Sequence, residues 1–182
     1  MEKAIGMVET ISVARGHLIA DAMLKAADVR LLACSTTCPG KFVIIVGGQV
    51  SAVKSAMSAG LAEGSESVVD STLLPNVHED VFRALSGSTQ VEKIKDLGLI
   101  ETMSSAASIE AADAVAKSAK VTLVEIRVGR GMGAKAFFSF TGEISDVKTA
   151  LKAGKDIVAA KGMLVDAVAI SRPSPALMET LW

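Results

Sequence analysis

Aromatic side chains are scarce in this chain of 182 residues: it has no tyrosine, one tryptophan and five phenylalanines. Proteins that bind single-stranded nucleic acids rely on such side chains, because bases stack on them. The formal net charge is only −1, which offers no positive surface to a nucleic acid backbone. We therefore expect no nucleic-acid partner.

Long apolar runs are missing as well. No stretch reaches the roughly 18 residues of a membrane-spanning helix, and the opening residues MEKAIGMVET lack the apolar segment of a signal peptide. We expect a cytoplasmic protein that makes no contact with a membrane. The chain has only two cysteines, and in a reducing compartment they indicate metal or redox chemistry rather than a disulfide.

What the chain does contain is one segment that occurs nearly twice. Residues 5–32 align with residues 97–124 at an offset of 92. An internal repeat decides the domain count before any local pattern does, and we therefore predict two domains, residues 1–90 and residues 91–182. The identical pairs include Gly6 with Gly98, Glu9 with Glu101, Asp21 with Asp113 and Lys25 with Lys117.

Each copy predicts the same order of secondary structure. In the first copy, strands are predicted over residues 4–10, 29–33, 42–46 and 67–74. A helix is predicted to begin after the N-cap residue Ser12, with an apolar stripe formed by Val13, Ala20, Met23, Leu24 and Ala27. The helical spacing of Val50, Val53, Met57 and Leu61 predicts a second helix.

The resulting order, β-α-β-β-α-β, is the split-βαβ or ferredoxin-like arrangement of the α+β class. It predicts an antiparallel sheet with both helices on one face, and the other face then needs cover or a partner. The second copy is longer by two residues between its second and third strands, because Lys41 aligns with Lys135 at an offset of 94.

Several separated motifs occur in the same order in both copies. The first copy reads GMVET, DAMLKAADV, a glycine-bearing turn before an apolar strand, GQV and a strand closing in PNVH, and the second copy closes in SRPS. This string resembles the bacterial microcompartment (BMC) shell domain, over nearly the whole chain. Among tandem members, TTCPGKF and LPNVH make the chain most similar to the PduT type of propanediol-utilisation compartments. The resemblance implies a structural shell protein, not an enzyme.

The resemblance implies an assembly. Tandem members of the family form trimers that look like hexagonal tiles, so we expect a homotrimer that meets other shell proteins edge to edge in a microcompartment shell. The family's tile-edge lysine falls on Lys25 and Lys117, and its edge arginine falls on Arg172. The first copy has Asn76 in place of that arginine, so arginine edge contacts are expected from the second copy only. Without the resemblance, both lysines would be interpreted as ordinary helix lysines that point into solvent.

The resemblance also locates a pore. The family's pore loop falls on Cys38-Pro39-Gly40 in the first copy and on the longer Gly129–Ala134 (GRGMGA) in the second. Because the two loops differ, a trimer of this chain has a threefold pore and not a sixfold one. The expected pore residues are Cys38, Gly40, Arg130, Gly131, Met132 and Gly133.

In the PduT type, the cysteine of CPGKF, here Cys38, lies on the threefold axis and holds an iron–sulfur cluster. The resemblance therefore implies a 4Fe-4S cluster, one per trimer, with Cys38 as its ligand and with Pro39 and Gly40 shaping the turn. The expected role is electron transfer across the shell, or cluster delivery, with a redox enzyme inside the shell as partner. Lys41 and Arg130 are the cations nearest to the site in the sequence.

Taken without the resemblance, a cysteine before Pro-Gly is usually a free thiol in a turn. Threefold symmetry changes this, because three converging thiolates repel one another unless a cation or a cluster neutralises them. Three thiolates suit a cubane cluster with one open iron, or a zinc ion with one open position. Cys34 forms no C-x-x-C pair with Cys38, and we interpret it as a small apolar core residue.

Two other functions stay open. One is the same tile with a cluster-free pore that passes small polar metabolites. The other is a soluble trimeric regulator or an enzyme, since a ferredoxin-like fold does not determine function. Against an enzyme, the sequence has no paired carboxylates, no nucleophile with a histidine and no metal-ligand spacing. The GRGMG stretch is not a phosphate loop, because no Lys-Ser/Thr follows and a strand is predicted next.

Overall fold

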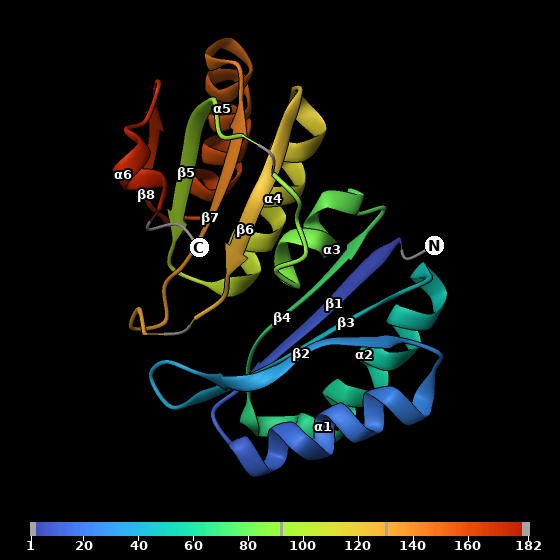
Figure 1. The fold of residues 1–182 in the computed structure, drawn as a ribbon. Helices are drawn as coiled ribbons and strands as arrows, with labels where there is room; N and C mark the ends of the chain where they lie inside the picture. The colour runs from blue at the N-terminus through green and yellow to red at the C-terminus, as the bar shows by residue number, and fades with distance from the viewer. Residues whose placement is uncertain (1–2, 92, 130, 180–182) are drawn as a thin grey trace. The chain divides into compact units, whose positions relative to one another are not determined.

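The computed structural model describes residues 3–91, 93–129 and 131–179, and it contains one α+β arrangement twice (Figure 1). The first unit consists of Met1–Phe82 and Gly129–Ala134, and the second consists of Arg83–Val128 and Lys135–Trp182. A loop from the second copy of the sequence is therefore part of the first unit. A domain boundary between residues 90 and 91 stays a prediction.

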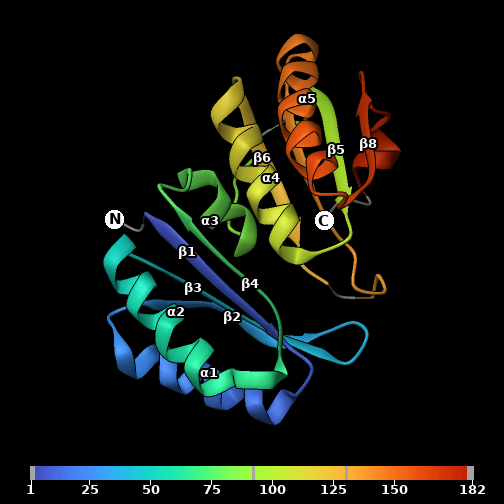
Figure 2. The same cartoon turned by 180° about the vertical axis from the view of Figure 1, so that it is seen from behind.

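The first unit has a four-stranded antiparallel sheet in the order β2-β3-β1-β4. Both long helices cover the same face of this sheet (Figures 1 and 2). The predicted β-α-β-β-α-β order is confirmed. Its elements are β1 (Ala4–Thr10), α1 (Val13–Ala26), β2 (Arg30–Thr37), β3 (Lys41–Gly48), α2 (Val50–Gly64), a 3-10 turn (Ser65–Ser67) and β4 (Val68–Pro75).

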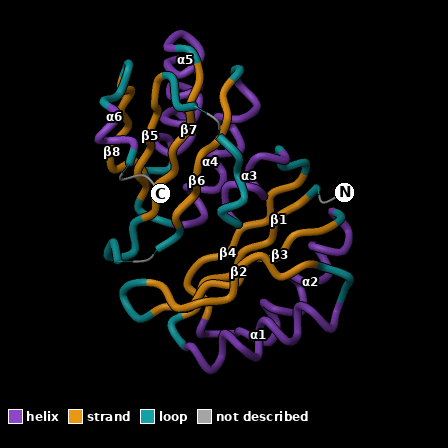
Figure 3. Tube along the Cα trace, viewed as in Figure 1, coloured by secondary structure: helices purple, strands orange, loops and turns teal. Residues whose placement is uncertain are grey.

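The second unit repeats this plan with the strand order β6-β7-β5-β8. Figure 3 shows the same succession of strands and helices along its trace. A short helix follows the fourth strand of each copy: α3 (Glu79–Leu85) comes after β4, and α6 (Pro175–Met178) comes after β8. The repeated elements are β5 (Asp96–Thr102), α4 (Ser105–Ser118), β6 (Val121–Arg127), β7 (Ala136–Gly142), α5 (Ile144–Ala160) and β8 (Leu164–Ile170).

The first helix of each copy begins with the same cap. The Ser12 hydroxyl oxygen accepts a hydrogen bond from the Arg15 N–H at 3.2 Å. At the equivalent position in the second copy, the Ser104 hydroxyl accepts from the Ala107 N–H at 3.2 Å. A serine at this position satisfies one of the N–H groups that the first turn of a helix leaves without a partner. The predicted N-cap at Ser12 is therefore confirmed.

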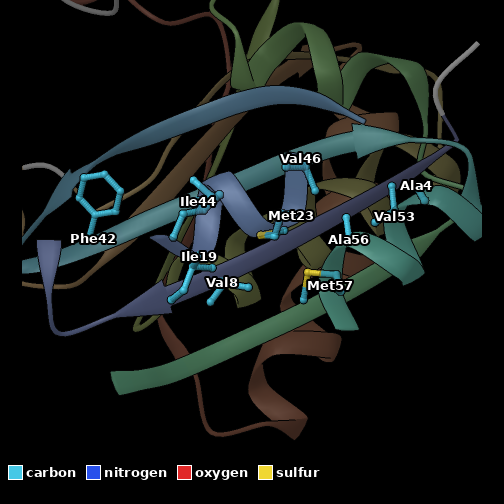
Figure 4. Packing of buried hydrophobic residues seen from close by; sticks show 11 residues of the cluster. Ala4, Val8, Ile19, Met23, Phe42, Ile44, Val46, Val53, Ala56 and Met57 are labelled. Atoms are coloured by element: carbon cyan, nitrogen blue, oxygen red, sulfur yellow. The ribbon is translucent and has the colours of Figure 1, made fainter. Parts of the chain in front are cut away.

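The core of the first unit lies between its sheet and its two helices (Figure 4). The stripe predicted for the first helix is only partly right, because Val13 and Leu24 are 41% and 40% exposed. The buried face is instead centred on Gly16 and Ile19, next to Ala20 and Met23. A Cβ at Gly16 would stand 2.3 Å from the ring of Phe42, so the missing side chain lets that side of the helix approach the sheet.

Strand β1 differs from a half-buried strand. All seven of its residues are buried. Ala4 and Val8 belong to the core beneath the helices, whereas Ile5 and Met7, which point to the other face, are also completely inaccessible. Both faces of this central strand are therefore buried, and simple alternation of apolar and polar residues is the wrong expectation there.

Gly98 of β5 provides a test of this packing. A Cβ at Gly98 would stand 2.3 Å from the ring of Phe140, which is fully buried and stacks on Phe138 at 6.0 Å between centroids. We expect Gly98→Ala to lower the free energy of unfolding by about 2 kcal/mol, because this ring has no free space to move into. Urea or thermal unfolding measures the change.

The matched control is Gly6→Ala, at the equivalent position of the first copy. Its new Cβ would stand 2.7 Å from the Met57 sulfur and 2.9 Å from a methyl carbon of Val53. A methionine side chain is flexible and can move aside, so the loss should be smaller. A loss for Gly6→Ala as large as that for Gly98→Ala would contradict this account of the two cores.

Candidate functional site

The predicted pore turn of the first copy is the tip of a β-hairpin. Cys38, Pro39 and Gly40 connect β2 with β3, and the last cross-strand pair before the turn is Thr37 with Lys41. Gly40 has φ +76°, a conformation that glycine adopts without steric cost. The Cys38–Pro39 peptide bond is cis. Cys38 is half-buried while the two residues after it are exposed, so the thiol lies at an accessible tip.

The predicted pore loop of the second copy contacts this turn. The Gly131 N–H donates a hydrogen bond to Cys38 Sγ at 3.2 Å. In the opposite direction, the Cys38 N–H donates to the Gly129 carbonyl oxygen at 2.7 Å. The structure thus brings together Cys38 and Gly131, which were predicted as pore residues from two different copies. Met132 is half-buried, Gly133 is exposed, and Arg130 lies outside the described residues.

Two further groups adjoin the turn. The buried hydroxyl of Thr37, directly before the cysteine, has no hydrogen-bond partner among the described residues. Such a buried polar group is costly unless a ligand or a neighbouring chain completes it. On the other side, the Lys41 ammonium pairs with the Glu9 carboxylate at 3.0 Å. The positive charge of Lys41 is therefore already balanced by a carboxylate of its own chain.

The same lysine–glutamate pair occurs in the second copy. Lys135 follows the second pore loop and pairs with Glu101 at 2.5 Å. Lys41 is the first residue of β3 and Lys135 directly precedes β7, and in both copies the glutamate lies near the end of the first strand. The pair joins these two strands next to the loop, so it helps to fix the base of each predicted pore loop.

The other cysteine has a different environment. Cys34 lies within β2, opposite Ile44 of β3, and packs against the core of the first unit. Burial raises the pKa of its thiol, which disfavours the thiolate form that binds metals. Its surroundings agree with the interpretation of Cys34 as a small apolar core residue.

A metal site within one chain has no support in the structure. Over residues 3–91, 93–129 and 131–179, no three histidine, cysteine, aspartate or glutamate side chains gather to hold a metal ion. A metal or cluster at Cys38 would therefore need ligands beyond those that the described residues of one chain supply. The chemistry of this position fits such a group, since it offers an accessible sulfur, an N–H donor to that sulfur and an unsatisfied hydroxyl beside it.

The two predicted edge lysines occupy equivalent positions. Lys25 is in the last turn of α1 and pairs with Asp21 at 2.5 Å, and Lys117 is in the last turn of α4 and pairs with Asp113 at 2.6 Å. The Lys25 side chain is 76% exposed and that of Lys117 is 43% exposed. The Lys25–Asp21 pair is exposed at both ends, and a pair of this kind stabilises a protein by only about 0.3–0.5 kcal/mol, so its ammonium can readily exchange its partner. The Lys117 pair is partly buried, because Asp113 is buried.

Arg172 is held by a residue that sequence reasoning missed. Its backbone has φ +47°, and its N–H donates to the Asp96 carboxylate at 2.8 Å, while the Ser171 hydroxyl donates to the same oxygen at 2.9 Å. Both bonds lower the pKa of Asp96, and the bond from the Arg172 N–H has the larger effect. The equivalent residue of the first copy, Asn76, has φ +55°. Asparagine tolerates this left-handed conformation, but arginine needs support.

Only one signal in the sequence could have revealed this support. The first strand of the second copy begins with an aspartate, where the first copy has Ala4. The second copy thus has Asp96 together with Arg172, whereas the first copy has Ala4 together with Asn76.

Comparison with known proteins decides the family. The model of the BMC domain matches this chain twice, over residues 4–77 and over residues 96–173. The chain belongs to the BMC-domain shell proteins. It is 41% identical to the bacterial microcompartment shell protein PduT of Citrobacter freundii over 182 residues, which cover 100% of this chain and 97% of that relative. The shell protein PduA of the same organism is 37% identical over 86 residues, which cover 46% of this chain and 92% of PduA.

A solved structure agrees over the full length of this shell protein. The crystal structure of a microcompartment protein from Desulfitobacterium hafniense DCB has a TM-score of 0.96 and 46% sequence identity, and the match covers 98% of this chain and 99% of that one. The chain is thus a tandem BMC shell protein of the PduT-like kind, as its motifs indicated. BMC shell proteins are structural components that oligomerise and tile with other shell proteins, and they are not enzymes.

A helix that spans a bilayer has to be long and apolar. Within the part of the chain that the structure describes, no helix has the length and apolar character for that. Its place is the shell of a bacterial microcompartment.

The support of Arg172 by Asp96 predicts a dependence on pH. A carboxyl whose folded pKa is lowered stabilises the fold above its unfolded pKa of about 3.9, and this contribution is lost as the pH falls through the folded pKa. We expect Asp96→Asn to unfold at a lower temperature than wild type at pH 7. The difference should shrink as the pH falls below about 4.

Thermal unfolding of both proteins at a series of pH values measures this. The control is Asp156→Asn, which removes the exposed partner of Lys152 on α5 and should change stability little at any pH. A difference between Asp96→Asn and wild type that is constant down to the lowest pH would show that the charge of Asp96 is irrelevant.

Proposed function

We propose that this shell protein forms a homotrimer whose six BMC domains build a pseudohexameric tile, with a 4Fe-4S cluster held at the central pore. In each chain, residues 1–90 and residues 91–182 are the two domains. The cluster is the group through which electrons cross the shell. The single observation that carries this proposal is the half-exposed Cys38 at the tip of a hairpin, with an N–H donor directed at its sulfur.

The trimer is supported by the repeat itself. Two similar domains in one chain give a threefold assembly the outline of a sixfold one. The predicted edge residues recur at equivalent positions, since Lys25 and Lys117 each pair with an aspartate one turn earlier. A single contact of this kind is weak, but a tile has six edges, and multivalency then makes a sheet stable.

The cluster is supported by the chemistry of the turn. A trimer places three copies of Cys38 around one axis, and three sulfurs are a suitable set for a cubane with one iron left open. When bound, the cluster takes up and releases one electron at a time. Pro39 and Gly40 shape the turn that presents the sulfur, and Gly131 donates to it. A redox enzyme inside the shell is the proposed electron partner.

The edge role leads to a first test of assembly. We expect the double substitution Lys25→Glu and Lys117→Glu to abolish the two-dimensional sheets seen by electron microscopy, while light scattering still reports a trimer. The Lys25 pair is exposed, so its loss costs only about 0.5 kcal/mol of folding free energy. Lys117→Glu costs more, because it places a second carboxylate beside the buried Asp113, and light scattering checks that the trimer stays intact. Each new glutamate instead repels the backbone carbonyls and carboxylates that a neighbouring tile presents.

A matched control is available on α5. Lys152 pairs with Asp156 in the same i,i+4 geometry and is about as exposed as Lys25, but it is not a predicted edge residue. Lys152→Glu should therefore form normal sheets. If the double variant forms the same sheets as wild type, the edge role is wrong, and if light scattering gives a monomer or a dimer of wild type, the tile itself is wrong.

The cluster leads to a second test. Protein purified without oxygen should carry about one cluster per trimer, as measured by iron and sulfide analysis and by low-temperature EPR. Cys38→Ser should lose the cluster and remain trimeric, because a hydroxyl does not replace a thiolate ligand. Cys34→Ser is the control and should keep it, since Cys34 packs against the core.

The opposite pattern would overturn the assignment of the ligand: a cluster retained in Cys38→Ser, or lost only in Cys34→Ser. A wild-type trimer that forms sheets without iron would favour the tile with an open pore for small metabolites. A trimer that forms no sheets would favour a soluble regulator.

A further inference from the structure

The Gly129–Ala134 loop has a closer relation to Cys38 than a shared pore requires. The two hydrogen bonds described for Cys38 both go to this loop. Its sulfur accepts from the Gly131 N–H, and its backbone N–H donates to the Gly129 carbonyl. The loop is also part of the first unit, although the sequence on either side of it belongs to the second. A loop of the second copy thus holds the cysteine of the first copy through two hydrogen bonds.

An N–H group directed at a sulfur changes the properties of that sulfur as a ligand. It withdraws electron density and stabilises negative charge, and hydrogen bonds to the sulfurs are among the factors that set the potential of a cluster. A reduced cluster carries one more negative charge than an oxidised one, so the same N–H stabilises the reduced form more. Each trimer contains three such donors by symmetry.

We propose that Gly131 is a positioning residue for the cluster: its N–H orients the Cys38 sulfur and raises the reduction potential of the bound group. This inference rests on the proposed function. It assigns to the loop of the second copy a role in tuning a site whose ligand comes from the first copy. The two pore loops then differ because one carries the ligand and the other carries its hydrogen-bond donor.

The geometry explains why glycine stands at this position. Gly131 has φ +71°, and a Cβ there would meet nothing within 4 Å. A side chain is therefore excluded by the backbone conformation and not by a lack of space. Alanine at position 131 strains the loop, and the relaxed backbone carries the N–H away from the sulfur.

The chain offers a closely matched control. Gly133 lies in the same loop with φ +61°, and a Cβ there likewise meets nothing within 4 Å. The structure records the bond to Cys38 Sγ from Gly131 and not from Gly133. Gly131→Ala and Gly133→Ala therefore introduce the same kind of strain, and only the first disturbs the donor to the sulfur.

The first experiment compares the reduction potentials of trimers loaded with their cluster. We expect Gly131→Ala to shift the midpoint potential to a more negative value and to lose its cluster faster in air, with Gly133→Ala resembling wild type in both. Equal potentials in Gly131→Ala and wild type, or equal shifts in both variants, would overturn the proposal.

The second experiment uses cluster-free protein labelled with ¹⁵N-glycine, so that it does not depend on the cluster. Hydrogen exchange of the Gly131 amide should be slowed in wild type and become faster in Cys38→Ala, while exchange at Gly133 stays the same. If wild type never binds a cluster, the proposed function fails, and protection of Gly131 still shows that the loop positions the Cys38 thiol. Exchange at Gly131 that does not respond to Cys38→Ala overturns the positioning role.

Discussion

The candidate site depends on two hydrogen bonds between a hairpin tip and a loop from the other copy of the repeat. Alone, a cysteine in an exposed turn has no single direction, because its side chain samples several staggered rotamers. The Gly131 N–H gives the Cys38 sulfur a preferred direction, and the Gly129 carbonyl holds the cysteine backbone. The direction of the thiol and the N–H dipole next to its sulfur both follow from this link.

Some interactions occur in both copies of the repeat, and others occur in only one. Helix caps at Ser12 and Ser104 occur in both copies, as do the helix pairs of Lys25 and Lys117. These interactions stabilise the first helix of each copy, and both copies need them in the same way. Differences between the copies lie at the two predicted pore loops and after the last strand, where the backbone of Arg172 is held by a carboxylate that the first copy lacks.

Much of the fold could be predicted from the sequence because the repeat and the apolar periods are local. Confirmed in this way were the order of the elements, the antiparallel sheet, the helices on one face and the cap at Ser12. The stripe on α1 was partly wrong, since helical spacing does not say which side of an alanine-rich helix meets the sheet. Gly16 decided that, through its close approach to Phe42.

By itself, the sequence determined the domain repeat, the shell-protein family and the candidate ligand Cys38, because each of these is read from contiguous motifs and from residue identities between the two copies. Only the tertiary structure decided that Gly131 faces this cysteine, that Asp96 supports Arg172, and that Glu9 pairs with Lys41. The physical reason is that each of these is a contact between residues at least 32 positions apart. No local propensity encodes such a contact, and it forms only when the antiparallel sheet and its loops bring the two segments together.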